Sequence, residues 1–328
     1  MNLQKKIILN KNLIDLNSLK LSVKSKYFIE CSNDQDLKSV HAFLKNKKIK
    51  FFILGEGTNI VFKKNFDGLI IKNSYKTLKK VNGNKIKISS GFNWDKFVQY
   101  CLNNSLYGVE NLSGIPGSIG ASPIQNIGAY GKEVSSLIES IEIFNLKTGK
   151  NEEFLKKDMF FKYRDSIFKK KSHLFIKNIC FSLNKDFIPN TSYDDLKNKK
   201  FDNAIDVRKE ILRIRKRKLE NYKINPNVGS FYKNPIINEK KLKQILSIHD
   251  DLKFYKYKKD YKVSAAWLID RCNWKGKKLK KSFVSKKHAL VLVNKDSKSS
   301  SILGLSNKIK KEISNKYKIK LTEEPRII

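Results

Sequence analysis

A glycine-rich segment near the middle of the chain places the strongest constraint on what the chain can fold into. Between residues 114 and 131 glycine first recurs at every third position and then flanks a turn of small residues. Without a Cβ atom, such a backbone reaches positive φ angles and lets a ligand approach its amide groups closely. Successive exposed N–H groups then form a concave site for an anion such as a pyrophosphate. The polar side chains of Gln125, Asn126 and Tyr130 in this segment favour a nucleotide-type cofactor over a simple turn.

The composition predicts a large, strongly basic protein without a dedicated nucleic-acid partner. The chain has 328 residues, which suggests two or three domains with substantial cores. Its 69 Lys and Arg residues against 31 Asp and Glu give a formal charge of +38, and a large positive charge is also typical of nucleic-acid-binding proteins. Here the lysines are spread along the whole chain and accompany many Asn and Ile residues, whose codons are equally A/T-rich. We therefore attribute the excess to genome composition, expect no nucleic-acid binding, and expect the charge to attract anionic substrates.

Cysteine, histidine and hydropathy patterns argue against several other classes. The four histidines show no metal-ligand spacing, so we expect no metal site. No apolar run approaches the ~20 residues of a membrane span, and the run after Met1 is too short for a signal peptide. Four cysteines lie far apart in apolar stretches, as expected of buried, reduced thiols in a cytoplasmic protein. They are Cys31, Cys101, Cys180 and Cys272.

Hydrophobic periodicity predicts a mixed α+β protein. Expected strands cover residues 27–31, 51–54, 60–62, 69–72, 85–89, 138–144 and 289–293. Expected helices cover residues 34–45, 94–102, 197–219, a segment starting at 265, and 302–317. The turn at 55–59 differs from a dinucleotide-binding fingerprint because its third glycine is missing and a strand follows it. The basic helix over 197–219 ends just before an unusual turn at 225–230, where we expect a domain junction.

Three further motifs are denser in polar groups than ordinary amphipathic elements. Polar and aromatic residues alternate over 163–169, Ser230 stands on a glycine-flanked turn, and Glu324 precedes Arg326 in the tail. No Ser-His-Asp arrangement accompanies them, since the chain has no G-x-S-x-G elbow. Each motif alone has a structural explanation, so their joint order along the chain is the informative feature.

That order resembles the UDP-N-acetylenolpyruvoylglucosamine reductase (MurB) family of flavoenzymes. The resemblance is carried by residues 55–59, 114–131, 163–168 and 229–235 and by the glutamate-bearing tail. It runs from about residue 17 to the C-terminus and is most specific over 122–131 and 163–169. The region of Tyr193 and the insertion before Ala265 are similar to the type I subgroup.

The resemblance implies an α+β protein with an FAD-binding fold of the vanillyl-alcohol-oxidase (PCMH-like) type in two subdomains, followed by an α+β substrate-binding domain. We expect the FAD-binding subdomains at residues 1–72 and 73–218, the substrate-binding domain at 219–319, and at 320–328 a tail that returns to the active site. The pyrophosphate of FAD would lie against loop amides of both glycine segments. The flavin-site candidates are Gly55, Gly57, Thr58, Asn59, Gly117, Ser118, Ser122, Pro123 and Asn126.

The resemblance further implies a two-stage reduction with FAD and NADPH as cofactors. NADPH reduces FAD and leaves, and UDP-N-acetyl-3-O-(1-carboxyvinyl)-glucosamine then receives hydride at C3 from the flavin N5 to give UDP-N-acetylmuramate for peptidoglycan synthesis. Charge developing at C2 and on its carboxylate requires a polarising donor and an acid. By motif match Arg164 and a protonated Glu324 polarise the carboxylate, and Ser230 protonates C2. Substrate contacts carry over to Tyr130, Tyr163, Tyr193, Lys218 (at the diphosphate), Asn234 and Lys275.

Several positions depart from the family pattern. Residues 17–19 replace an Asn-Thr-Phe motif at the flavin edge, and His288 stands where the type I pattern has glutamine. The tail reads Thr-Glu-Glu-Pro over 322–325 in place of Glu-Pro-Glu-Val, which moves a proline next to the proposed catalytic glutamate. The substrate-contacting tyrosine before Ala265 is either Tyr255 or Tyr257, and both stay open.

Two alternative functions stand beside the main hypothesis. One is an FAD-dependent oxidase of the same superfamily, which would have no need of Arg164, Ser230 and Glu324 together. The other is a basic nucleic-acid-binding protein on an inactive flavin fold. The main hypothesis predicts a cytoplasmic monomer that acts on small molecules, with no nucleic-acid or membrane partner.

Overall fold

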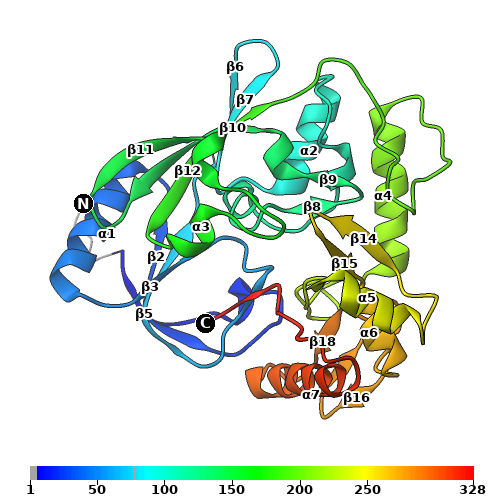
Figure 1. Ribbon diagram of the computed structural model, residues 1–328. Helices are drawn as coiled ribbons and strands as arrows, with labels where there is room; N and C mark the ends of the chain where they lie inside the picture. The colour runs from blue at the N-terminus through cyan, green and yellow to red at the C-terminus, as the bar shows by residue number, and fades with distance from the viewer. Residues whose placement is uncertain (1–5, 77) are drawn as a thin grey trace. The chain divides into compact units, whose positions relative to one another are not determined.

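The computed structural model describes residues 6–76 and 78–328 and divides into two compact units (Figure 1). Unit 1 comprises the described residues up to Lys11 together with Lys24–Glu56 and Phe66–Arg215. Unit 2 comprises Asn12–Val23, Gly57–Asn65 and Lys216–Ile328. The last boundary falls near the junction expected after residue 218, while two short N-terminal segments belong to unit 2. The four domain bounds expected from the sequence stay a prediction.

The first sheet of unit 1 is built around three parallel strands. Its order is β1 (Ile8–Asn12), β2 (Lys24–Cys31), β5 (Phe66–Asn73) and β3 (Phe51–Leu54), and both β2 and β3 pair in parallel with β5. Helix α1 (Asp34–Lys47) follows β2, and Asn33 caps its start by accepting the Asp36 N–H at 3.0 Å. Leu37, Val40 and Leu44 of α1 are buried in one core with strand residues. The carboxyl end of β3 leads directly into the glycine turn at residue 55.

The second sheet of unit 1 is antiparallel and carries a larger core. Its order is β11 (Lys150–Leu155), β10 (Ile138–Asn145), β12 (Leu174–Ser182), β7 (Lys85–Ser89) and β6 (Leu78–Val81). Helix α2 (Trp94–Asn103) packs its apolar face into this core, where the rings of Phe97 and Phe181 lie 4.8 Å apart. The Trp94 Nε1–H donates to Leu112 O at 2.8 Å and so fixes the segment before the glycine loop.

Short elements complete unit 1, and one helix differs from its predicted length. The short elements are η3 (Glu110–Leu112), η4 (Ile119–Ala121), β8 (Gly128–Ala129), β9 (Lys132–Glu133), η5 (Val134–Ser136), η6 (Lys156–Met159) and α3 (Ile167–Lys170). Helix α4 spans Ala204–Lys218, so the prediction of helix from 197 was wrong. The Asn203 side chain accepts the Asp206 N–H at 3.0 Å, and this cap starts the helix seven residues later than the apolar spacing indicated.

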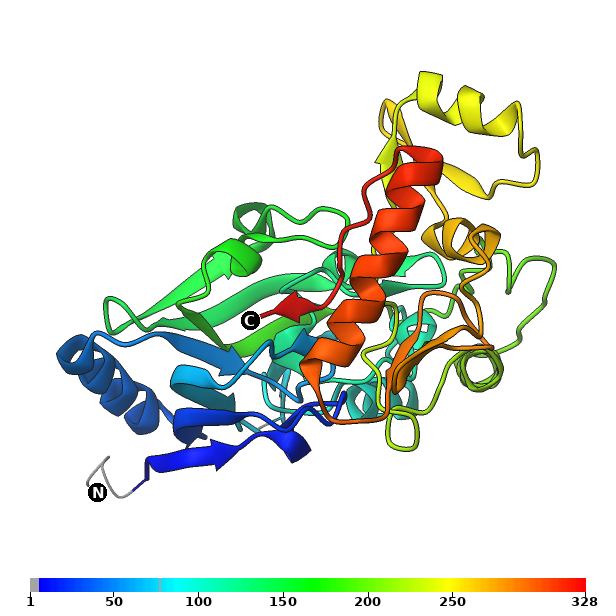
Figure 2. The same ribbon diagram turned by 90° about the horizontal axis from the view of Figure 1, so that it is seen from below.

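Unit 2 combines two small sheets with three helices. One sheet has the order β13 (Ile236–Ile237), β15 (Asp260–Val263), β14 (Phe254–Tyr257), and the other β16 (Lys278–Leu279), β17 (Ser282–Val284), β18 (Leu292–Asn294). The helices are α5 (Glu239–Leu246), α6 (Ala265–Arg271) and α7 (Ser299–Tyr317). The remaining elements are η2 (Ile14–Leu16), β4 (Ile60–Val61) and β19 (Arg326–Ile327), of which the last two pair in parallel. Figure 2 shows the tail leaving α7 and running back along it to β19.

Two sequence expectations need small corrections. The apolar run 289–293 is buried as expected, but its regular ladder begins only at Leu292, because the residues before it turn through His288. Cys31, Cys101 and Cys272 are buried free thiols, whereas Cys180 is only half-buried and lies 3.8 Å from Glu139 Oε2. Within residues 6–76 and 78–328, no helix is both long and apolar enough to cross a bilayer. The same residues contain no cluster of three or more His, Cys, Asp or Glu side chains that could hold a metal ion.

Candidate functional site

The two glycine segments of unit 1 meet at the carboxyl end of β3. A Cβ atom on Gly55 would lie 2.7 Å from Ser118 Oγ, so a larger residue would require the Ser118 side chain to move. Ser118 is buried, and the neighbouring Gly117 accepts the Trp94 N–H at 2.9 Å. Segments more than 60 positions apart in the sequence thus contact each other, and their expected role in flavin binding stays a prediction.

A half-buried lysine contacts the first of these glycine segments. Lys72 Nζ donates to Gly55 O at 2.6 Å, and burial lowers the pKa of Lys72. The carboxylate of Glu56 lies close enough to oppose this shift and accepts from Asn93 Nδ2 at 3.1 Å. Glycine backbone backed by a lysine is a chemically suitable cradle for an anionic pyrophosphate. Sequence reasoning missed Lys72 because it reads as one more lysine in a strand.

The polar side chains of the glycine-rich loop shape the loop itself. The Ser122 hydroxyl donates to Ile119 O at 2.7 Å, and Pro123 O accepts the Asn126 N–H at 3.3 Å. Asn126 Nδ2 donates to Glu133 Oε2 at 2.8 Å, while its Oδ1 accepts the Ser135 N–H at 3.0 Å. These side chains therefore hold the backbone that would face a ligand.

The remaining flavin-site candidates lie in unit 2. Gly57 has φ +66°, and a Cβ there would lie 1.9 Å from Leu16 O, which no side chain could tolerate. Its carbonyl accepts the Ser18 N–H at 3.0 Å, and Ser18 Oγ donates to Asn227 O at 2.7 Å. The divergent 17–19 segment thus packs on the turn that leads into Thr58 and Asn59.

An arginine and three tyrosines gather in unit 1. Arg164 Nη2 donates to Gly128 O at 2.9 Å, and its Cζ lies 5.3 Å from the ring centroid of Tyr163. The rings of Tyr130 and Tyr193 meet edge to face at 5.6 Å. Burial raises the pKa of Tyr193, while the charge of Arg164 opposes the rise, which places the guanidinium nearby. The structure therefore brings together four of the predicted substrate and catalytic residues.

Residues that the sequence did not single out hold this cluster. Arg215, on α4, hydrogen-bonds the Tyr130 hydroxyl, and burial lowers the pKa of Arg215. Asn111 Nδ2 donates to Tyr130 O at 2.8 Å and to Asn190 O at 2.9 Å. Asp95 accepts from the Gly114 N–H at 2.6 Å and from both terminal nitrogens of Arg208 at 2.6 and 2.8 Å. The basic residues of α4 were the only signal of this network in the sequence.

Ser230 and Glu324 lie on neighbouring backbone segments of unit 2. Ser230 is bridged to Val291, and the next residue, Phe231, donates its N–H to Leu290 O at 2.8 Å. The Glu324 N–H donates to Phe231 O at 2.9 Å, and the Arg326 N–H donates to Asn59 O at 3.0 Å. The tail is thus hydrogen-bonded both to the segment of Ser230 and to the turn at Asn59. We call these paired backbone segments, which carry Ser230, Glu324 and Asn59, the serine ladder.

The other predicted substrate residues of unit 2 occupy several places. Asn234 Oδ1 accepts the Ala265 N–H at 3.0 Å at the start of α6. Lys275 lines a surface hollow with Gly276, Lys277 and Lys286, and Lys218 ends α4. Tyr255 and Tyr257 both belong to β14, and the choice between them stays open.

His288, the other departure noted in the sequence, supports the turn before the serine segment. Its Nδ1 accepts the Leu290 N–H at 3.2 Å, and its carbonyl accepts the Val291 N–H at 3.0 Å. Since Leu290 and Val291 are the neighbours of Phe231 and Ser230, His288 acts on the backbone that borders the serine.

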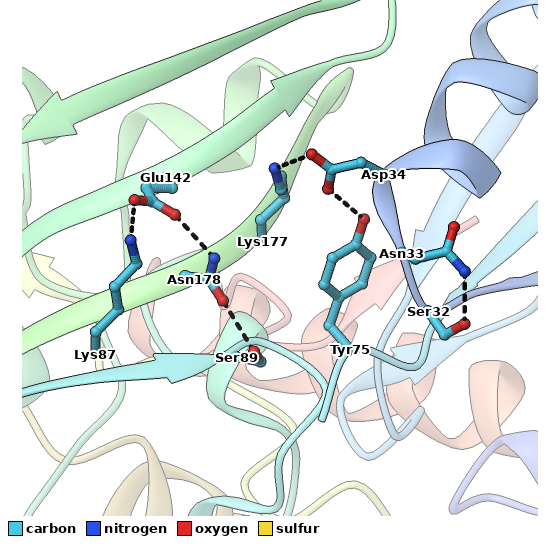
Figure 3. Close-up of a pocket in the computed structure, with 9 residues that line it drawn as sticks. All are labelled: Ser32, Asn33, Asp34, Tyr75, Lys87, Ser89, Glu142, Lys177 and Asn178. Atoms are coloured by element: carbon cyan, nitrogen blue, oxygen red, sulfur yellow. Dashed lines mark hydrogen bonds and ion pairs between the residues drawn. The ribbon is translucent and has the colours of Figure 1, made fainter. Parts of the chain in front are cut away.

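A polar cleft elsewhere in unit 1 contains none of the predicted site residues (Figure 3). Lys177 Nζ donates to Asp34 Oδ2 at 2.7 Å, and the Tyr75 hydroxyl donates to Asp34 Oδ1 at 3.1 Å. Burial alone would raise the pKa of Asp34, but these donors hold it below its usual range. Lys87 pairs with Glu142 in the same way. Because the charges drawn here neutralise one another, we interpret this cleft as structural.

Comparison with known families identifies the class of protein. A family model described as an FAD binding domain matches residues 25–154, and one described as the C-terminal domain of UDP-N-acetylenolpyruvoylglucosamine reductase matches residues 219–328. Together with the glycine cradle, they define an FAD-containing oxidoreductase with an α+β fold.

Full-length relatives narrow the class to one family. The chain is 34% identical to UDP-N-acetylenolpyruvoylglucosamine reductase of Bdellovibrio bacteriovorus, covering 96% of this chain and 97% of that protein. It is 36% identical to the enzyme of the same name from Buchnera aphidicola, covering 95% and 94%. The crystal structure of the reductase (MurB) from Thermus caldophilus has the same fold, with a TM-score of 0.70 at 19% identity, over 98% of this chain and 97% of that one. The chain belongs to the UDP-N-acetylenolpyruvoylglucosamine reductase family.

Proposed function

We propose that this protein reduces the enolpyruvyl group of UDP-N-acetyl-3-O-(1-carboxyvinyl)-glucosamine to give UDP-N-acetylmuramate, with NADPH as the electron source. Family membership supports the activity. The single structural observation that carries the proposal is the ladder that joins the Ser230 segment to the Glu324 tail. Because the two segments are hydrogen-bonded, the residues that carry the Ser230 hydroxyl and the Glu324 carboxyl are held at a fixed separation.

The cradle of Gly55, Ser118 and Lys72 would hold the anionic pyrophosphate of FAD, and the bound flavin would supply the hydride that C3 of the enolpyruvyl group receives. The chain's own side chains then act on the charge that develops at C2. We assign the proton donor to Ser230, since a serine hydroxyl can protonate a strongly basic carbanion-like centre in a site without water.

Arg164 and Glu324 act on the substrate carboxylate. A guanidinium and a protonated carboxyl both donate hydrogen bonds, and donors aimed at developing negative charge lower the barrier most. Arg164 is oriented for this by its bond to Gly128 O and by the Tyr163 ring. Tyr130, Tyr163, Tyr193, Lys218, Asn234 and Lys275 are the proposed substrate contacts, with Lys218 at the diphosphate.

The finer expectations from the sequence belong to the same proposal. We place the enzyme in the cytoplasm, where its nucleotide-sugar substrate and NADPH are dissolved, and we expect it to act as a monomer on small molecules. We expect no nucleic-acid and no membrane partner. The oxidase and nucleic-acid-binding alternatives gain no support from the relatives, which carry the reductase name.

The purified holoprotein tests the proposal directly. We expect a yellow protein whose NADPH consumption depends on the enolpyruvyl substrate, with a product that has gained two hydrogen atoms by mass spectrometry. NADPH consumption matched by oxygen uptake and indifferent to that substrate would favour an oxidase. A colourless protein retained on DNA in a salt-dependent manner would favour the binding protein.

A further inference from the structure

The tail carries two adjacent glutamates, and the structure gives them different surroundings. Glu323 lies opposite Tyr232 in an antiparallel bridge, and residues opposite each other in such a pair share one face. The Tyr232 hydroxyl hydrogen-bonds Ser306 Oγ at 2.9 Å on α7. The Glu323 carboxylate forms an ion pair with Lys310, also on α7. Since residues 306 and 310 are one helical turn apart, Glu323 and Tyr232 are both directed at the same face of α7.

Glu324 follows Glu323 at a bend of the chain, and its backbone N–H is bonded to Phe231 O at 2.9 Å, next to the serine segment. Exchange of the two glutamates by a one-residue slip would place the wrong carboxyl beside the serine segment. Something must hold the register of this short tail.

Pro325, which follows the two glutamates, weakens the backbone contribution to the register of the tail. Pro325 has no N–H, so it cannot donate to either neighbouring segment. It also disfavours helical backbone at Glu324, where the chain bends. Before the glutamates, the carbonyl of Thr322 accepts the Lys233 N–H at 3.0 Å. After the proline, the Arg326 N–H donates to Asn59 O at 3.0 Å. The ion pair lies between these two anchors.

We infer that the Lys310–Glu323 ion pair is a positioning device that sets the register of the tail and so presents Glu324, and not Glu323, to the substrate. The two side chains are only 29% and 20% exposed, so their attraction is less screened than that of a surface pair. Lys310 acts through Glu323 and touches no reacting atom. The inference rests on the proposed catalytic role of Glu324.

Separate measurement of the two half-reactions tests the inference. In Glu323→Gln and in Lys310→Met, we expect flavin reoxidation by the enolpyruvyl substrate to fall by about tenfold. Flavin reduction by NADPH should stay within about twofold, because it does not require the carboxyl of Glu324. The charge-swapped double variant Glu323→Lys/Lys310→Glu should recover most of the lost rate, and Lys310→Arg should behave like the unmodified protein.

The controls separate register from general damage. Lys243→Met removes a comparable pair with Glu239 on α5 of the same unit, at 2.9 Å but far more exposed, and should change neither half-reaction. Unchanged reoxidation in Glu323→Gln, equal loss in both half-reactions, or failure of the charge swap to restore the rate would overturn the inference. Glu324→Gln distinguishes the two proposals. If Glu324→Gln reoxidises normally, the catalytic role of Glu324 is wrong; if it is impaired while Glu323→Gln is normal, only the positioning role is wrong.

Discussion

The cluster of Arg164 with Tyr130, Tyr163 and Tyr193 in unit 1 and the paired backbone segments of Ser230 and Glu324 in unit 2 hold their candidate side chains by different means. Around Arg164 the backbone adopts left-handed conformations at Asn126, Tyr130 and Arg164, with φ of 47°, 46° and 52°. Such non-glycine positions are strained and persist only where the surroundings enforce them. Side chains enforce them here, including those of Asn111 and Arg215. Ser230 and Glu324, by contrast, are fixed by backbone hydrogen bonds between extended segments.

This difference predicts how far the structural effect of a side-chain substitution extends in each unit. In unit 1 the loss of one side chain should disturb its neighbours, since each is part of the support of the next. In unit 2 a substitution of Ser230 or Glu324 itself leaves the backbone ladder in place and should remove only the chemistry of that side chain, whereas Lys310 and Glu323 act on the register of the tail. The predictions below test this contrast, from the largest expected effect to the smallest.

Arg164→Met should give the largest loss. Removal of the guanidinium takes away both a donor to the substrate carboxylate and the bond to Gly128 O, so substrate-driven flavin reoxidation should fall by about 1000-fold. Stopped-flow absorbance measures this rate. Arg164→Lys should restore little, because a lysine cannot reproduce the planar guanidinium geometry. Full recovery with lysine would show that only the charge matters.

Asp95→Asn should destabilise unit 1 by about 2 kcal/mol, the usual range for a charged hydrogen bond. Burial alone would raise the pKa of Asp95, but Arg208 and the Gly114 N–H hold it below its usual range. A depressed carboxyl pKa adds stability above the unfolded pKa of about 4 and loses it as the pH falls below that value. Urea unfolding at pH 7 and pH 3 should therefore show a larger difference between the two proteins at pH 7.

The exposed Lys243–Glu239 pair of unit 2 provides the matched control for that prediction. Glu239→Gln should leave the unfolding midpoint almost unchanged at either pH, because exposed pairs contribute little. Equal destabilisation by Asp95→Asn and Glu239→Gln would contradict the idea that the network around α4 is a special support.

Arg215→Met should raise the KM for the enolpyruvyl substrate by about tenfold with a smaller change in kcat, since Arg215 orients Tyr130 and touches no reacting atom. A double-mutant cycle with Tyr130→Phe sharpens the test. If the two residues act through one hydrogen bond, the combined effect should be smaller than the sum of the single effects. Full additivity would mean that they act independently.

The sequence predicted much of the fold because its signals are local. The apolar periodicity of α1, the half-buried strand at 51–54 and the glycine turns depend on neighbouring residues. The start of α4 was wrong because a capping asparagine outweighed apolar spacing. Arg164, Ser230 and Glu324 came from motif order, and their catalytic roles stay predictions.

The supporting residues could not be read from the sequence. Lys72 reaches the carbonyl of Gly55, 17 positions away, Asn111 reaches Asn190, 79 positions away, and Lys310 meets Glu323 across the tail. Lysine is so common in this chain that none stands out. Only the folded chain shows which of them contact a functional loop.

The most direct test of the account follows both half-reactions of Ser230→Ala by stopped flow at about 450 nm, where oxidised flavin absorbs. If Ser230 protonates C2, NADPH should bleach the flavin within about twofold of the unmodified rate, while reoxidation by the enolpyruvyl substrate should slow by about 100-fold or more. Equal slowing of the two half-reactions, or normal reoxidation, would contradict the assignment of Ser230 as the acid.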